Sequence, residues 1–305
     1  MYVSRIQIVS DPSNVVAKSL AKSLEDIGYY IVQHHPEVYI YFYPIGITVR
    51  KIAGLIKDKV TDPVVISVTD DGSYVIPLIK EHRGGSIIGE IIADLMGSQL
   101  ILTSRTSQLG IYSVEEFAWI NGLSIDSKQS DILNMKLVRN GKLKIYLQDR
   151  LDLKVIEGFE LVENSDEADA CVGEEVNGKP LLRPLHLALG IGYARNVPFE
   201  VLYFSAINTL KSIHVYEKRL EFIVTPEIKK DDEKLKKIGN LLGASVIYVP
   251  IDQLKGRTQS TPSRVAKERF GVEGVCEPSL EALGTRIVLK RTKRAYGVVT
   301  CLGVK

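Results

Sequence analysis

Short apolar segments alternate with helical patterns over most of the chain, and this alternation limits the possible folds more than any other feature. Runs rich in β-branched residues or tyrosine at 5–9, 38–43 and 64–68 predict strands. An amphipathic helical stripe follows each of the first two runs, and Gly28 ends the first stripe. Such alternation produces mostly parallel sheets covered by helices. The sequence therefore predicts a protein of the α/β class.

The helical stripes are recognised by apolar residues three or four positions apart. One stripe runs over 16–27, a second over 49–60, and a third over 87–95 before Gly97. Glycine just past a stripe is a common helix end, because it adopts the left-handed conformation without steric cost. Three helices are therefore predicted in the first hundred residues.

The segment 122–183 has a different pattern. Asn140-Gly141 separates two short alternating segments, 136–139 and 142–146, and Asn177-Gly178 is a second dipeptide of the same kind. Asn-Gly suits the positive φ angles of a two-residue hairpin turn. We therefore expect a small α+β region that is rich in β-hairpins.

The α/β pattern returns near Leu185 and continues to Leu302. The predicted strands are 185–189, 221–224, 245–249, 286–289 and 297–302, and the predicted helices are 198–211, 231–242 and 263–270. The whole chain is thus predicted to form two parallel-sheet α/β domains that flank a small α+β middle region. The expected domains are residues 1–121, 122–183 and 184–305.

Charge and hydropathy exclude several classes of protein. The 305 residues include 39 basic and 37 acidic side chains, a balance that is not typical of a nucleic-acid or membrane surface. No apolar run reaches the roughly 18 residues of a membrane-spanning helix. The first residues lack the pattern of a signal peptide. We therefore expect a cytoplasmic protein with neither a nucleic acid nor a membrane as partner.

The three cysteines are Cys171, Cys276 and Cys301, all in apolar surroundings and without a Cys-x-x-Cys spacing. An odd number of widely spaced cysteines disfavours a disulfide framework and a zinc site. We predict buried thiols that pack as small hydrophobic side chains. No protein metal site is expected.

Ligands in open α/β sheets bind outside the carboxyl ends of the strands. One such loop, 43–46, leads into the helix that carries Arg50. A helix N-terminus offers unpaired N–H groups, and an arginine can bind a carboxylate through two parallel bonds. From spacing alone, a glycine turn beside a surface arginine is the alternative.

A second candidate loop, 77–85, contains His82 followed by Gly84 and Gly85. Histidine titrates near neutral pH and can act as a general acid or base. The two glycines allow a ligand to approach the backbone closely. A solvated surface histidine is the alternative interpretation.

Two loops in the C-terminal half complete the candidates. Gly190-Ile191-Gly192 is half of a dinucleotide-binding motif, without its third glycine. Glu277 stands just before Pro278 at a predicted helix start, where it is either catalytic or a favourable charge at the N-terminus. A basic run at 290–294 is either a solvated turn or a carboxylate-binding segment.

Two blocks of motifs follow one another in a defined order and spacing. The block within 40–110 contains Gly46-Ile47-Thr48-Val49-Arg50, Lys57-Asp58-Lys59, Asp62-Pro63, Asp71-Gly72, Val75-Ile76-Pro77-Leu78 and His82-Arg83-Gly84-Gly85. The block within 186–304 contains Gly190-Ile191-Gly192, Pro262-Ser263, Gly271-Val272, Gly274-Val275-Cys276-Glu277 and Lys290. Together they resemble the cobalt-precorrin-5A hydrolases (CbiG) of anaerobic cobalamin synthesis.

The resemblance implies a hydrolase that opens the δ-lactone ring of cobalt-precorrin-5A, releases acetaldehyde and leaves cobalt-precorrin-5B. Such a reaction needs a base that activates water and donors that stabilise the oxyanion. The cobalt belongs to the substrate, so the resemblance implies no cofactor. The expected partner is a small-molecule tetrapyrrole, and a homo-oligomer is left open.

The resemblance also suggests roles for individual residues. His82 or Glu277 would be the general base or acid, and the amides of Gly84 and Gly85 would stabilise the oxyanion. The substrate carries many carboxylates, so basic side chains are expected around it. The residues expected at the substrate are Arg50, Lys57, Lys59, Gly84, Gly85, Gly190, Gly192, Ser263 and Lys290.

Two other functions remain open at this stage. The chain could bind or carry a corrinoid without catalysis, and binding of cobalt-precorrin-5A without acetaldehyde would favour that function. It could instead be a nucleotide-binding α/β protein built on Gly190 and Gly192. Thermal stabilisation by nucleotides but not by corrinoids would favour the nucleotide-binding function.

Overall fold

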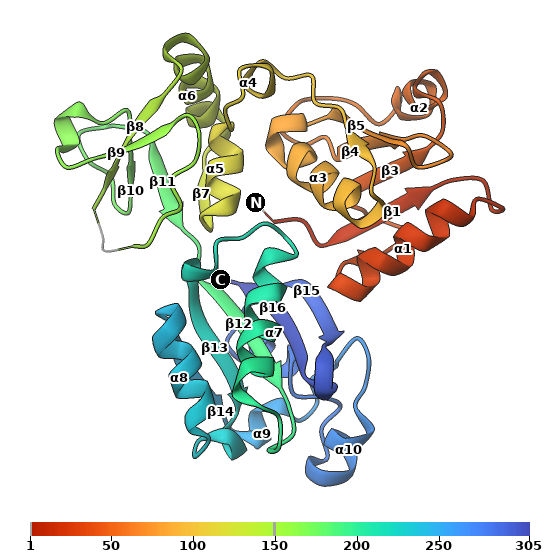
Figure 1. Ribbon diagram of the computed structural model, residues 1–305, viewed down its shortest axis with the longest axis vertical. Helices are drawn as coiled ribbons and strands as arrows, with labels where there is room; N and C mark the ends of the chain where they lie inside the picture. The colour runs from red at the N-terminus through yellow and green to blue at the C-terminus, as the bar shows by residue number, and fades with distance from the viewer. Residues whose placement is uncertain (1, 149–150) are drawn as a thin grey trace. The chain divides into compact units, whose positions relative to one another are not determined.

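The computed structural model describes residues 2–148 and 151–305 (Figure 1). The chain forms two compact units. Unit 1 comprises Met1–Ser23 and Ile31–Pro184, and unit 2 comprises Leu24–Tyr30 and Leu185–Lys305. Three sheets with mostly parallel strands and covering helices confirm the predicted α/β class. The finer division of residues 1–183 into two domains stays a prediction.

The first sheet has six strands in the order β2-β1-β3-β4-β5-β6. Their bounds are β1 Arg5–Val9, β2 Tyr30–Ile31, β3 Val38–Phe42, β4 Val64–Val68, β5 Tyr74–Ile79 and β6 Gln99–Leu100. Strands β1, β3 and β4 pair in parallel, and β5 returns antiparallel to β4. The three parallel strands are the ones that the sequence predicted from β-branched and tyrosine-rich runs.

Helices α1 (Val15–Ile27), α2 (Ile45–Ile52), α3 (Gly85–Met96) and α4 (Arg105–Gln108) accompany this sheet. The predicted extension of α2 to residue 60 is wrong. The carboxylate of Asp62 accepts the N–H groups of Lys57 and Asp58, and that of Asp58 accepts those of Val60 and Thr61. Because carboxylates satisfy these amides, the chain forms a capped loop there instead of another helical turn.

The second sheet has the order β7-β11-β10-β8-β9. Its strands are β7 Leu123–Ile125, β8 Leu143–Leu147, β9 Phe159–Val162, β10 Ala170–Val172 and β11 Leu181–Pro184. Helices α5 (Val114–Ile120) and α6 (Ser127–Asn140) belong to the same part of unit 1. All pairs in this sheet are parallel except β7 with β11.

Both predicted hairpins in this region are wrong. Residues 136–139 are the last turns of α6, and Gly141, with φ of 75°, is the C-cap of that helix. Asn177 and Gly178 also have positive φ, but they lie between β10 and β11, which pair in parallel. A helix C-cap and a loop turn need the same left-handed residues as a hairpin, so Asn-Gly alone does not distinguish them.

The sheet of unit 2 has the order β14-β13-β12-β16-β15. Its strands are β12 Leu187–Gly192, β13 Leu220–Pro226, β14 Ser245–Val249, β15 Arg286–Lys293 and β16 Val299–Val304. The helices are α7 Phe199–Lys211, α8 Glu233–Leu242, α9 Ile251–Leu254, α10 Arg264–Phe270 and α11 Glu277–Ala282. Strands β12, β13 and β14 are parallel, while β16 is antiparallel to both β12 and β15.

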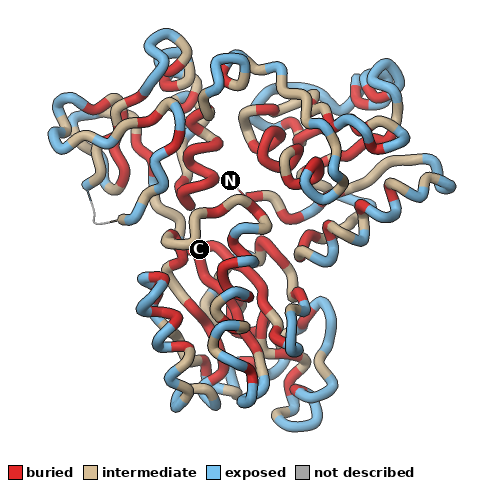
Figure 2. Tube along the Cα trace, in the orientation of Figure 1, coloured by how far each residue is buried: buried red, intermediate tan, exposed pale blue. Residues whose placement is uncertain are grey.

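Short 3₁₀ segments complete the described secondary structure: η1 Glu81–Arg83, η2 Ser165–Glu167, η3 Glu217–Arg219, η4 Glu227–Lys229 and η5 Ala295–Gly297. Figure 2 shows the buried residues concentrated along the central strands and on the inward faces of the helices. Among the helices of the described residues, none has the length and hydropathy that crossing a membrane requires.

One apolar cluster of unit 2 includes Cys276 and Cys301, which the structure joins as a disulfide with Cα atoms 6.0 Å apart. The expectation of separate thiols is wrong for this pair, because residues far apart in sequence meet where α11 packs on β12 and β16. Cys171 is a free buried cysteine, as predicted.

Gly190 also belongs to this contact. A Cβ atom on it would lie 2.5 Å from Cys301 Sγ and 2.7 Å from the Cys276 carbonyl oxygen. Real Cβ atoms do not approach other atoms so closely, so the strand and the start of α11 can pack this tightly only around glycine.

Gly190→Ala is expected to lower the free energy of unfolding by about 1–3 kcal/mol, because the added methyl group overpacks a close backbone contact. Urea denaturation monitored by circular dichroism measures the change. The matched control is Gly54→Ala, whose Cβ would meet no atom within 4 Å. A Gly190 variant as stable as the control would contradict the packing role.

Candidate functional site

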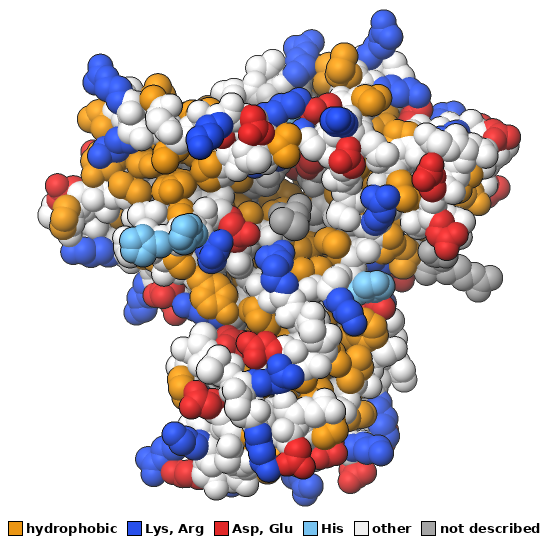
Figure 3. Space-filling model, turned by 180° about the vertical axis from the view of Figure 1, so that it is seen from behind, with side chains coloured by type: hydrophobic (Ala, Val, Ile, Leu, Met, Phe, Trp, Pro, Cys, Tyr) orange, Lys and Arg blue, Asp and Glu red, His pale blue; other side chains and the backbone are white. Residues whose placement is uncertain are grey.

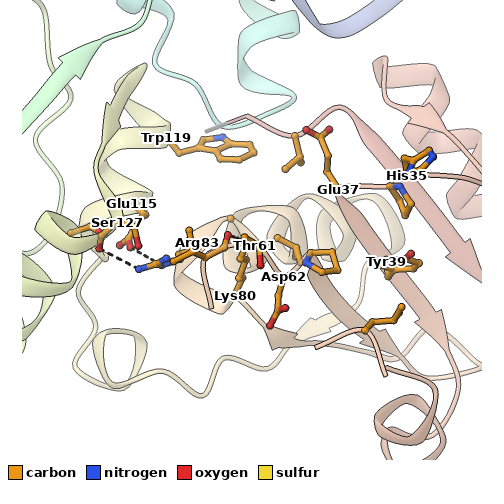
Figure 4. Close-up of a pocket in the computed structure, with 18 of the residues that line it drawn as sticks. His35, Glu37, Tyr39, Thr61, Asp62, Lys80, Arg83, Glu115, Trp119 and Ser127 are labelled. Carbon is orange, nitrogen blue, oxygen red and sulfur yellow. Dashed lines mark hydrogen bonds and ion pairs between the residues drawn. The ribbon is translucent and has the colours of Figure 1, made fainter. Parts of the chain in front are cut away.

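A cavity of about 670 Å³ lies within unit 1 (Figure 4). It opens at the amino-terminal ends of β3 and β4, and α5 and α6 provide its opposite wall. The functional loops were predicted at the carboxyl ends of the strands, so the sequence did not predict this cavity. Its charged and aromatic lining residues are His35, Glu37, Tyr39, Asp62, Lys80, Arg83, Glu115 and Trp119.

Arg83 connects the first sheet to the helices across the cavity. Its Nη2 donates to Asp131 Oδ1 at 2.8 Å. Its Nε lies 3.4 Å from Glu115 Oε1, and Figure 4 shows these two side chains facing each other. Lys59 also pairs with Asp131, at 2.5 Å. Arg83 Nε and Glu115 Oε1 are both buried without a hydrogen-bond partner within the protein. Because these two atoms lie against each other as a long, buried ion pair, they join the first sheet to α5 and are not exposed to a ligand.

Lys80 contributes the second cation of the lining. Its ammonium donates to the carbonyl oxygen of Val60 at 2.7 Å, and its backbone has a φ of 58°. Burial lowers the pKa of Lys80, and the nearby Arg83 lowers it further. Because three carboxylates line the same cavity as these two cations, the lining is not the uniformly basic cleft that a polycarboxylate was expected to need.

The glycine pair after His82 is only partly available to a ligand. Gly84 lines the cavity, whereas the N–H of Gly85 donates to the Lys80 carbonyl at 2.9 Å. In this conformation Gly85 cannot also donate to an oxyanion. The backbone carbonyl of His82 accepts from Ser113 Oγ at 3.2 Å, and its half-buried side chain is not part of the cavity lining.

The predicted cations of unit 1 lie on its surface. Arg50 is exposed on α2, and Lys57 and Lys59 are exposed in the loop that follows. Several apolar side chains of the same segment are also exposed: Ile45, Ile47, Val49, Leu55, Ile56 and Val60. Figure 3 shows hydrophobic side chains gathered over this N-terminal part of the chain, with basic side chains among them. We call this combination of residues 45–60 the α2 surface.

Glu277 is buried at the start of α11, in unit 2, whereas His82 lies in unit 1. The two carboxylate oxygens of Glu277 accept hydrogen bonds from the N–H and the hydroxyl of Ser260, each at 2.6 Å, and from the N–H of Arg291 at 2.5 Å. These bonds occupy both carboxylate oxygens and leave little room for a substrate. The geometry therefore favours an anchoring role for Glu277, which joins the loop at 256–262 to β15.

Gly190 and Gly192 were expected in a loop, but they are buried in β12. A Cβ on Gly192 would lie 2.5 Å from Val275 Cγ2. These glycines therefore serve close packing between β12 and the segment 275–276. They leave no phosphate-binding loop here, which removes the basis of the nucleotide-binding alternative.

The remaining predicted residues have local partners in unit 2. Ser263 is the N-cap of α10 and accepts the N–H of Ala266 at 3.3 Å. Lys290 lies in β15, not in a turn, and its ammonium is 3.2 Å from Glu25 Oε1. The described residues contain no group of three or more metal-ligating side chains.

Glu81 is a structural residue of this region that was not among the predicted site residues. Its buried carboxylate accepts the N–H groups of Thr103 and Ser104 at 2.9 and 2.8 Å, and the Thr103 hydroxyl at 2.8 Å. Burial raises the pKa of Glu81, but these hydrogen bonds outweigh burial and lower it below the usual value. The signal in the sequence was the Thr103-Ser104 pair, an N-cap pattern ahead of α4. Glu81 holds η1, and hence His82, against this segment.

Comparisons with known proteins extend these observations. The family model described as Cobalamin synthesis G N-terminal matches residues 32–107, and the one described as Cobalamin synthesis G C-terminus matches residues 187–302. A cobalt-precorrin-5A hydrolase from Priestia megaterium is 24% identical over 281 residues, covering 84% of this chain and 75% of that protein. The Salmonella typhimurium cobalt-precorrin-5A hydrolase is 25% identical over 282 residues, covering 85% of this chain and 79% of that protein.

A solved structure supports the same likeness at the level of the fold. The crystal structure of a cobalamin biosynthesis protein G homolog from Sulfolobus solfataricus aligns with a TM-score of 0.60 and 18% identity. The alignment covers 99% of this chain and 97% of that one. The architecture described above is therefore shared over nearly the full length of both chains.

Glu81→Gln is expected to lower the free energy of unfolding at pH 7 by about 1–3 kcal/mol, because the amide cannot replace charge-assisted bonds to two N–H groups. The folded-state pKa of Glu81 is lowered. Its contribution is therefore fully present above the ordinary glutamate pKa of about 4.3 and is lost as the pH falls through the folded-state value. The difference between wild type and variant should shrink over that acidic range.

Urea unfolding at a series of pH values measures this difference. Glu163→Gln, at an exposed glutamate outside these bonds, is the control and should change stability by less than about 0.5 kcal/mol. A Glu81 difference that stays constant down to pH 2 would contradict the role given to the ionised carboxylate.

Proposed function

Since the chain belongs to the cobalamin synthesis G (CbiG) family, we propose that it is a cobalt-precorrin-5A hydrolase of cobalamin biosynthesis. The observation that carries this proposal is the ordered match of both family models, at 32–107 and 187–302. The relatives named cobalt-precorrin-5A hydrolase align with 84–85% of the chain, so the likeness extends through both compact units.

The proposed reaction has two bond-breaking stages. Water adds to the lactone carbonyl, and the acyl–oxygen bond breaks to give a carboxylate and an alcohol. Loss of the alcohol proton then forms a carbonyl group as the adjacent carbon–carbon bond breaks, and the two-carbon unit leaves as acetaldehyde. The electron pair of that bond stays with the macrocycle, which becomes cobalt-precorrin-5B. Both stages need a proton acceptor.

The cobalt ion is part of the substrate in this proposal, and the chain supplies binding and proton transfer. His82 is the proposed proton acceptor, because an imidazole nitrogen can act as a general base and η1 holds His82 two residues before Gly84, which lines the cavity. Glu277 is a weaker candidate, because its carboxylate already accepts bonds from Ser260 and Arg291. Gly84 is the better placed of the two glycines to meet a ligand, since the Gly85 amide is occupied.

A tetrapyrrole combines an apolar ring with a rim of carboxylates. The α2 surface has the matching combination, with exposed Ile47 and Val49 beside the guanidinium of Arg50. Burial of apolar ring area and charge-assisted bonds to carboxylates would both favour binding there. We propose that Arg50, with Lys57 and Lys59, contributes to substrate binding.

Anaerobic incubation with cobalt-precorrin-5A tests the function directly. The expected result is one equivalent of acetaldehyde for each substrate consumed, detected by a coupled dehydrogenase assay. Tight substrate binding without any acetaldehyde would instead support the corrinoid carrier. Two observations favour this second outcome: the Gly85 amide and the Glu277 carboxylate already have hydrogen-bond partners within the protein.

His82→Ala is expected to lower kcat for acetaldehyde release by about 10²–10⁴-fold, the usual contribution of a general base. His34→Ala removes an exposed histidine of the same unit and should leave kcat unchanged. Circular dichroism of both variants checks that the fold is intact. A His82 variant with the wild-type rate would remove this residue from the mechanism.

A further inference from the structure

A cluster of basic and tyrosine side chains lies at one edge of the unit 2 sheet. It comprises Tyr193, Arg195, Lys229, Asp232 and Lys234, and we call it the Tyr193 cluster. Tyr193 directly follows β12, while Lys229 ends the 3₁₀ segment η4 directly after β13. Because β12 and β13 (Figure 1) are parallel, the residues that follow them emerge at the same, carboxyl edge of the sheet. Open α/β sheets bind ligands at this edge.

The centre of the Tyr193 cluster is well ordered by hydrogen bonds. The Tyr193 hydroxyl donates to Asp232 Oδ2 at 2.9 Å, and Asp232 Oδ1 caps α8 by accepting the N–H of Lys234 at 3.1 Å. The ammonium of Lys234 donates to the carbonyls of Arg195 and Val197 at 2.8 and 2.9 Å. These bonds hold the loop after β12 against the start of α8.

Lys229 is the member that this network leaves unpaired. Its ammonium lies 4.2 Å from the centre of the Tyr193 ring, and no carboxylate of the described chain lies within ion-pair distance of it. Burial lowers the pKa of Lys229; the carboxylate of Asp232 offsets part of this effect, and the neighbouring Lys234 and Arg195 lower the pKa further. A half-buried ammonium with only a ring for a partner gains most from an added anion.

Arg195 and Tyr248 provide two further hydrogen-bond donors at this edge of the sheet. Arg195 is exposed, and the described residues supply no carboxylate partner for its guanidinium. Tyr248 is near the end of β14, parallel to β13, and its hydroxyl is buried without a hydrogen-bond partner in the protein. Burial and a hydrogen bond to Asp232 are the main causes that raise the pKa of Tyr193, and Tyr248 contributes to the same shift.

The charge of the Tyr193 cluster also favours an anion. Three cations stand against the single carboxylate of Asp232, and that carboxylate is committed to Tyr193 and the α8 cap. The exposed Glu233 nearby is paired with Lys236 at 2.7 Å. A carboxylate placed between Lys229 and Arg195 would therefore meet two cations that are free to bind it.

We propose that the Tyr193 cluster is a carboxylate-binding subsite for an acetate or propionate side chain of the tetrapyrrole, an assignment that rests on the proposed function. Lys229 and Arg195 bind the carboxylate, while Lys234 and Asp232 position the loop that carries Arg195. All residues of this subsite belong to unit 2, whereas the α2 surface and the cavity are formed by residues of unit 1.

Lys229→Gln and Arg195→Gln in the full-length protein test the subsite. Each is expected to raise the KM for cobalt-precorrin-5A about tenfold, with a smaller effect on kcat, because each removes one charge-assisted bond to the bound substrate. Lys211→Gln is the matched control, since it removes the same charge at the exposed far end of α7. It should leave KM within twofold of the wild type.

Binding of uroporphyrin I, an octacarboxylate tetrapyrrole, gives a readout that does not depend on turnover. Quenching of its fluorescence should show a dissociation constant several-fold higher for Lys229→Gln and Arg195→Gln than for wild type or Lys211→Gln. Thermal unfolding confirms that all variants are folded.

The outcomes separate the two proposals. Wild-type protein that releases no acetaldehyde contradicts the proposed function, and the uroporphyrin titrations still decide the subsite. Active wild type with unchanged KM and unchanged uroporphyrin binding in both Gln variants overturns the subsite alone. Variants that lower kcat without raising KM would also overturn the subsite, because loss of a substrate-binding group should raise KM.

Discussion

Parallel pairing of short apolar strands is the constraint on which the rest of this structure depends. Parallel neighbours cannot be joined by a tight turn, so each pair requires a longer connection. In the first sheet and in unit 2 these connections bring helices onto the sheet and loops to both of its edges. In unit 2, the parallel ladder of β12, β13 and β14 brings Tyr193, Lys229 and Tyr248 to one edge. In unit 1, the amino-terminal ends of β3 and β4 border the cavity instead.

Buried carboxylates hold the loops that this architecture creates. Glu81 accepts two backbone N–H groups ahead of α4, Asp62 accepts two in the loop after α2, and Glu277 joins the loop at 256–262 to β15. A buried carboxylate without such bonds would cost several kcal/mol, so each of these side chains determines the path of its loop. The acidic residues near the candidate sites thus serve the structure, and unpaired cations remain for an anionic ligand.

The spacing of apolar residues predicted helices and strands correctly where a segment followed a single helical or strand pattern. The apolar stripes of α3 and α8 and the β-branched run of β4 were located correctly, because burial of one face or of a whole strand imposes a period. Predictions failed where one local signal serves several structures. Asn140-Gly141 caps α6 and Asn177-Gly178 lies in a loop, although both dipeptides are typical of hairpins. The apolar stripe of α2 continues past Ile52, where the helix ends, but the carboxylates of Asp58 and Asp62 hold residues 57–61 in a loop.

The sequence by itself determined the α/β class and the family, because hydrophobic period and ordered motifs are properties of the chain alone. Only the tertiary structure decided which candidate groups are available to a ligand. Glu277 and the Gly85 amide stood out in the motifs, yet backbone partners occupy them. Lys229 stood in no motif, yet it lies half-buried and without a carboxylate partner in the described chain, over the Tyr193 ring. Hydrogen-bond saturation and burial depend on segments far apart in the sequence, and these two quantities determine what each polar group can do.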